Sequence, residues 1–103
     1  MVFIETPVFT KLVVDLLSDT EYARFQRHLA LDPYAGDVIK GTGGLRKIRW
    51  SAEGRGKRGG VRVIYFHVTD EHQCRLLLIY PKNAQDDLTA AQKKTLRKLN
   101  ENW

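Results

Sequence analysis

The sequence contains a single cysteine, Cys74, and no apolar run near the roughly 20 residues that a membrane-spanning helix needs. A lone thiol cannot form an internal disulfide, and nothing else in the sequence points to an oxidising compartment. The first residues, MVFIETPVF, lack the basic start and the small-residue cleavage site of a secretory signal. We therefore expect a cytoplasmic protein without a membrane partner, whose cysteine is reduced and buried.

Sequence patterns typical of metal sites and of common hydrolases are also missing. The histidines His28, His67 and His72 have no metal-ligand spacing with the cysteine or with acids. Asp86 and Asp87 are adjacent near an expected helix start, where the helix dipole favours negative charge. There is no Ser-His-Asp arrangement and no G-x-S-x-G motif. We expect no metal and no cofactor.

Length and composition predict one domain covering residues 1–103, because 43% hydrophobic residues support one modest core. The net charge is +5, but it is unevenly distributed. The segment 46–62 holds seven cations and one acid, a net charge of +6, so the rest of the chain sums to about −1. Such concentration favours a polyanion partner, although surplus Lys and Arg also serve solubility alone.

The N-terminal third predicts a strand followed by two helices. Val2–Glu5 is a short apolar run typical of a strand, and Thr6 with Pro7 fits a helix cap and first helical position. The segment 18–21 (Ser-Asp-Thr-Glu) is a capping box that predicts the start of a second helix. That helix should end near Leu31, because a proline follows at position 33.

The remaining sequence predicts a loop, three strands and a last helix. Residues 34–44 lack periodicity and are expected to form a loop. Residues 45–52, 61–69 and 74–80 are apolar and rich in β-branched and aromatic residues, which predicts an antiparallel meander. The capping box at 89–92 begins the last helix, whose apolar stripe would consist of Leu88, Leu96, Leu99 and Trp103. This order predicts an α+β fold in which helices cover one face of the sheet and leave the other available.

The first meander strand carries two cations on one face. Period-two alternation places Lys47 and Arg49 on one side and Arg46, Ile48 and Trp50 on the other. Like charges that are neighbours on a sheet face repel each other, so an anionic ligand explains them better than folding does. The alternative is a solvated strand whose charges prevent edge aggregation.

The connection between the first two meander strands is rich in glycine and cations. Its sequence, Gly54–Gly60, interleaves Arg55, Lys57 and Arg58 with four glycines. Glycine allows the backbone to bend around a phosphate while Lys and Arg supply charge. The spacing is not that of a P-loop, and a merely soluble hairpin is the alternative.

Further candidate residues lie near the strand ends. Arg62 opens the second meander strand, and Lys82 and Asn83 follow the third, so an antiparallel meander can bring them near the two cations of the first strand. Tyr65 and Tyr80 are able to stack on unpaired bases or donate a proton, although strand aromatics more often belong to the core.

Three segments in fixed order, GTGGLRKIRW (41–50), GRGKRGGVRVIYF (54–66) and LLLIYPKN (76–83), closely resemble the HigB-like toxins of the RelE superfamily. The resemblance covers nearly the whole chain and implies a RelE-like fold. It also implies a toxin that is encoded with an antitoxin and that cleaves messenger RNA in the A site of the small ribosomal subunit. Such enzymes use the substrate's own 2′-hydroxyl as nucleophile and need no metal.

The resemblance also implies residue roles. Lys47 and Arg49 match the alternating basic pair of RelE-type enzymes, Arg62 matches their strand arginine, and Lys82-Asn83 takes the place of a basic pair. An arginine side chain does not lose its proton and so cannot serve as a base, which leaves Arg49, Arg58 and Arg62 to hold the phosphate. Lys47 is the best base candidate, ahead of Lys57 and Lys82. The remaining RNA-binding candidates are Arg46, Arg55 and Asn83.

One departure from the RelE pattern concerns the general acid. The tyrosine expected shortly after the last strand is missing, and residues 84–88 are Ala-Gln-Asp-Asp-Leu. Either Tyr80 or Lys82 replaces it, or the substrate and the ribosome do more of the positioning. Two alternatives remain: an RNA- or ribosome-binding module without catalysis, and an interaction domain whose basic face binds an acidic protein.

Overall fold

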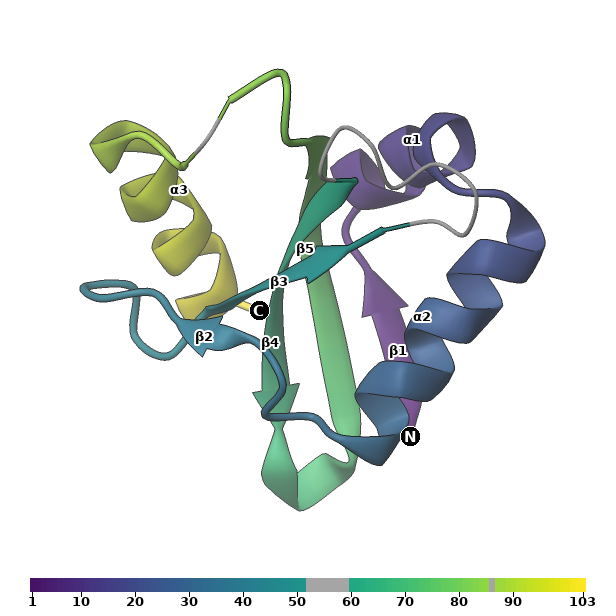
Figure 1. The fold of residues 1–103 in the computed structure, drawn as a ribbon. Coiled ribbons are helices and arrows are strands. Elements are labelled where there is room, and N and C mark those ends of the chain that lie inside the picture. Colours follow the sequence, from purple (N-terminus) through teal and green to yellow (C-terminus); the bar gives the residue numbers. More distant parts are fainter. Residues whose placement is uncertain (52–59, 86) are drawn as a thin grey trace.

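A computed structural model describes residues 1–51, 60–85 and 87–103. Its elements follow the predicted order, with a two-residue strand and a 3-10 turn added (Figure 1). Within the described residues there is no helix of the length and apolarity needed to cross a membrane. The elements are β1 (Val2–Glu5), α1 (Pro7–Leu16), α2 (Asp19–Leu31), β2 (Asp37–Val38), β3 (Arg46–Trp50), β4 (Val61–Val68), a 3-10 turn (Thr69–Glu71), β5 (Gln73–Pro81) and α3 (Ala90–Glu101).

The strands of the described residues form one sheet in the order β1-β5-β4-β3-β2. The antiparallel meander of β3, β4 and β5 is confirmed, and β1 pairs in parallel with β5 at one edge. The added strand is β2, which lies within the segment predicted to be a loop. It pairs Asp37 with Lys47 and Val38 with Arg46. Two residues are too few to give a periodic pattern, so this strand exists because of its tertiary pairing.

The predicted helix caps are confirmed. The Thr6 hydroxyl accepts a hydrogen bond from the Phe9 amide, and a proline follows the cap at the first helical position. Ser18 forms a reciprocal capping box with Glu21, and Thr89 forms one with Gln92. These local bonds satisfy amides that have no partner within the helix, so each helix begins where its sequence predicts.

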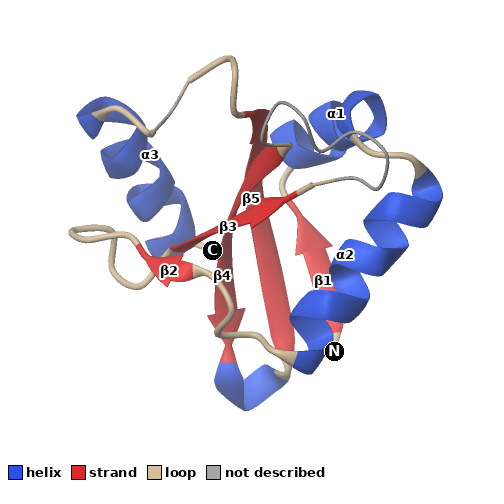
Figure 2. Ribbon diagram, in the orientation of Figure 1, coloured by secondary structure: helices blue, strands red, loops and turns tan. Residues whose placement is uncertain are grey.

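The helices lie on both faces of the sheet (Figures 1 and 2). The expectation that one face stays available was therefore wrong, because the C-terminal helix packs on the face opposite α1 and α2. Neighbouring β4 residues point to opposite sides, and each side has its own core. The α1/α2 core includes Phe9, Phe25, Leu29, Val63 and Leu76, and the α3 core includes Leu45, Ile64, Leu77, Leu88 and Leu96.

The buried stripe of α3 differs from the predicted one. Leu99 and Trp103 are 45% and 43% exposed, whereas Asn100 is buried. The cause is Arg75 on β5, which donates hydrogen bonds to the Asn100 carbonyl (3.2 Å) and side-chain oxygen (3.0 Å). The Arg75 guanidinium also lies 4.8 Å from the centre of the Trp103 ring. A polar contact therefore sets how the end of α3 faces the sheet, which hydrophobic spacing does not reveal.

Tyr65 belongs to the core and links β4 to the segment before β2. Its hydroxyl donates to the Pro33 carbonyl (2.8 Å) and accepts from the Gly36 amide (2.9 Å). We expect Tyr65→Phe to lower the free energy of unfolding by about 1–3 kcal/mol, because the buried Gly36 amide loses its partner. Urea unfolding measures this loss, and Tyr34→Phe is the control because Tyr34 is 55% exposed. Equal losses in both variants would contradict the prediction.

Cys74 is buried, as predicted, and unpaired. The thiol is 1% exposed, and burial raises its pKa to about 12. Because the thiolate is the reactive form, we expect negligible labelling by a thiol reagent in the native protein and full labelling after denaturation. With a thiol reagent that releases a coloured group on reaction, the absorbance of that group measures labelling of the native and the denatured protein. Rapid labelling of the native protein at neutral pH would contradict this burial.

Candidate functional site: a basic cleft

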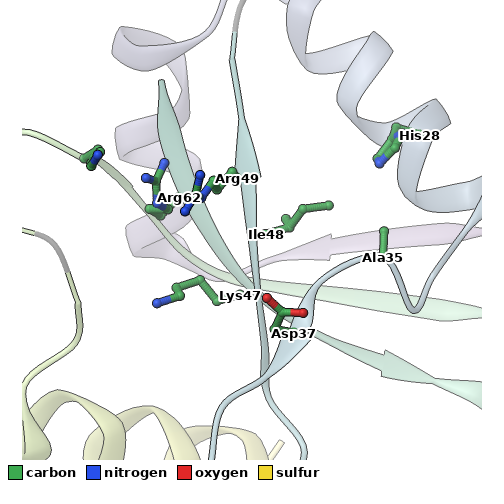
Figure 3. Close-up of a pocket in the computed structure, with 8 residues that line it drawn as sticks. His28, Ala35, Asp37, Lys47, Ile48, Arg49 and Arg62 are labelled. Carbon is green, nitrogen blue, oxygen red and sulfur yellow. The ribbon is translucent and has the colours of Figure 1, made fainter. Parts of the chain in front are cut away.

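Two arginines stand directly opposite each other on neighbouring strands. Arg49 of β3 pairs in register with Arg62 of β4, which in turn pairs with Tyr80 of β5. Residues in register on antiparallel strands point to the same face, with Cβ atoms about 4.5–5.5 Å apart. Figure 3 shows the two guanidinium groups extending from adjacent strands into the same space. Lys47 lies two residues from Arg49 on β3 and shares its face.

These side chains line one cleft of about 730 Å³. Four of the five candidate catalytic residues line it, namely Lys47, Arg49, Arg62 and Lys82. The sequence indicated only that an antiparallel meander can bring them together. β2 pairs only with Arg46 and Lys47 of β3, so β3 is the edge of the sheet beyond them, and Ile48 and Arg49 line the cleft there with α2 nearby (Figure 3). The described residues that line the cleft are His28, Ala35, Asp37, Lys47, Ile48, Arg49, Arg62 and Lys82.

The cleft concentrates positive charge. Arg49 is exposed, whereas Arg62 is 4% exposed and donates to the Val61 carbonyl at 3.3 Å. Two like charges directly opposite each other destabilise a strand pair, by an amount on the scale of the 0.2–1 kcal/mol that such pairs contribute. A bound anion removes this repulsion. The two opposed arginines therefore suit an anionic ligand such as a phosphate.

Lys47 is engaged by a carboxylate from outside the sheet. Its ammonium lies 3.2 Å from Asp87 Oδ1, which also accepts the Leu88 amide at 2.8 Å. The Leu88 hydrogen bond, followed by the contact with Lys47, lowers the pKa of Asp87. Asp87 therefore connects the segment before α3 to β3, a role that its expected place at a helix start does not indicate. Asp86 lies outside the described residues.

Some predicted residues do not meet in the cleft. Tyr80 is 6% exposed in the α3 core, burial raises its pKa, and its hydroxyl has no hydrogen-bond partner among the described residues. Arg46 lies on the opposite face, where it donates to the Gly36 carbonyl at 2.7 Å. Asn83 is exposed and is not among the lining residues. The predicted RNA-binding residues Arg55, Lys57 and Arg58 lie outside the described part of the chain.

Two titratable lining residues were not predicted, His28 and Asp37. His28 projects from α2, and its ring centre lies 5.5 Å from that of Trp50 on β3. Asp37 lies on the unpredicted strand β2. Their sequence neighbourhoods carry no motif, and only the pairing of β2 with β3 brings Asp37 to the cleft. Within residues 1–51, 60–85 and 87–103, no three His, Cys, Asp or Glu side chains cluster as metal ligands.

Comparison with known proteins identifies the fold. No protein-family model matches the sequence. A mutant of the Escherichia coli toxin RelE in the free state superposes with a TM-score of 0.60 at 12% identity, covering 96% of this chain and 95% of that one. The isolated E. coli RelE toxin gives 0.59 at 11% identity, covering 95% and 97%. A chain of the intact E. coli RelBE toxin-antitoxin complex gives 0.59 at 13% identity, covering 78% and 94%. The protein has the RelE-like fold.

Proposed function

We propose that this protein is the toxin of a type II toxin-antitoxin pair, of the HigB-like branch, and that it cleaves messenger RNA on the ribosome. The observation that carries the proposal is the register pairing of Arg49 with Arg62 in a cleft also lined by Lys47 and Lys82. A ribose-phosphate link is the anion that such a cleft suits, and RNA supplies its own nucleophile in the 2′-hydroxyl. The RelE-like fold supports the same assignment.

In the proposed reaction the arginines hold the scissile phosphate. Arg49 and Arg62 approach from adjacent strands, so each donates to a different part of the phosphate and stabilises the charge that develops on it. Lys47 adds a third positive charge from the same face. Attack of the 2′-oxygen on phosphorus releases the 5′-oxygen and leaves a 2′,3′-cyclic phosphate, and neither step needs a metal.

Two partners follow from this proposal. The ribosome is the first, because its small subunit presents the message in the A site and supplies proximity that a small open cleft lacks. An antitoxin is the second, since the similar E. coli toxin occurs in a toxin-antitoxin complex. Both partners place the proposed activity in the cytoplasm.

Primer extension on a translated message tests the proposal. We expect the wild-type protein to create new 5′ ends within the coding sequence, and to create none when initiation is blocked. The double variant Lys47→Ala/Arg62→Ala should create none in either condition. Ribosome binding without new ends would indicate a non-catalytic binding module. Binding to an acidic protein, without ribosome binding, would indicate an interaction domain.

A further inference from the structure

The cleft contains one carboxylate among its cations. Of the described residues that line it, Asp37 alone is acidic. It is the register partner of Lys47, so both side chains project from the same face of the sheet. Figure 3 shows the Asp37 carboxylate at the cleft, beside the backbone of Lys47. An exposed carboxylate at this position weakens the binding of an anion. Its presence among the cations therefore indicates a role other than holding the anion.

The other groups that share the face of the two arginines are poorly suited to accept a proton. The remaining titratable lining residue, His28, projects from α2, and its ring centre lies 5.5 Å from that of Trp50, whereas Asp37 is in register with Lys47 on the face of the cations. The arginines remain protonated at any accessible pH. Lys47 forms its ion pair with Asp87 as an ammonium, and a lysine must first lose its proton to act as a base. Tyr80, whose hydroxyl is buried, does not line the cleft. A carboxylate is acceptor-only when ionised, so Asp37 supplies what the surrounding donors lack.

We propose that Asp37 is the general base of the cleft, a role that rests on the proposed RNA cleavage. Its carboxylate takes the proton of the 2′-hydroxyl as the 2′-oxygen forms a bond to phosphorus. The bond between phosphorus and the 5′-oxygen breaks, and that oxygen takes a proton from the Lys82 ammonium at the same cleft. The products are a 2′,3′-cyclic phosphate and a 5′-hydroxyl. Asp37 then returns its proton to water, and Lys82 regains one from water.

The substitution Asp37→Asn separates this role from a purely electrostatic one, because the two predict opposite effects. Removal of a negative charge from an anion-binding cleft leaves RNA binding unchanged or tighter. Loss of a general base lowers the single-turnover cleavage rate by about 10²- to 10⁴-fold. We therefore expect programmed ribosomes to bind the Asp37→Asn protein at least as tightly as wild type and to release cleaved message far more slowly.

Two further variants complete the experiment. Asp15→Asn makes the same charge change on exposed α1 surface and should cleave at the wild-type rate. Asp37→Glu keeps a carboxylate and should cleave faster than Asp37→Asn. Wild-type or higher cleavage by Asp37→Asn overturns the assignment, as does equal loss of binding and cleavage. A wild-type protein that binds ribosomes but never cleaves overturns the proposed function itself, and the role of Asp37 with it.

Discussion

Arg62→Ala is expected to lower ribosome-dependent cleavage by about 10²- to 10³-fold, the loss typical when one preorganised donor to a developing oxyanion is removed. Arg62 is the arginine of the cleft that is almost completely buried, with 4% of its surface exposed. Its guanidinium is therefore held in place by the fold before substrate arrives, which makes its contribution to the transition state large. Single-turnover cleavage on programmed ribosomes measures the effect.

Controls separate the loss of charge from a loss of folding. Arg27→Ala removes the same charge from an exposed position on α2 and should cleave at the wild-type rate. Arg49→Ala removes the register partner of Arg62, which is exposed, so it should impair cleavage without loss of stability. Normal cleavage by both Arg62→Ala and Arg49→Ala would exclude the two opposed arginines as the phosphate site.

The largest effect on stability is expected from Phe25→Ala. Phe25 has no exposed surface and its ring contacts the edge of the Trp50 ring, with centres 5.5 Å apart, so it joins α2 to β3. Truncation of a buried Phe costs about 3–5 kcal/mol, a large share of the stability of a small domain. We expect a correspondingly lower midpoint of urea unfolding, followed by tryptophan fluorescence.

Leu31→Ala provides the matched control, because Leu31 ends the same helix and is 82% exposed. Its unfolding midpoint should stay within experimental error of wild type. If Phe25→Ala unfolded at the same denaturant concentration as Leu31→Ala, the packing of α2 on β3 would not hold the cleft edge as described.

Local sequence patterns predicted most of the fold because most of its boundaries are local. The Ser18–Glu21 and Thr89–Gln92 capping boxes act within one turn, and both helices begin there. Period-two alternation correctly separated Lys47 and Arg49 from Ile48. What failed was long-range: β2 depends on pairing with β3, and the orientation of α3 depends on Arg75 binding Asn100.

The candidate site divides in the same way. The clustering of Lys47, Arg49 and Arg62 follows from strand alternation and the meander, both visible in the sequence. Asp37 and His28 reach the cleft from elements without a functional motif, so only three-dimensional pairing reveals them. Tyr80 lies in the α3 core, and strand position alone does not tell whether a hydroxyl ends in a core or in a cleft.

One measurement tests the central claim most directly, namely that the basic cleft promotes attack by the RNA's own 2′-hydroxyl. Ribosomes are programmed with two messages that differ by a single 2′-deoxy substitution at the mapped cleavage position in the A-site codon. The wild-type protein should cut the all-ribose message there, leaving a 2′,3′-cyclic phosphate, and should leave the substituted position intact. Cleavage of the 2′-deoxy message at the same position and rate would contradict this account.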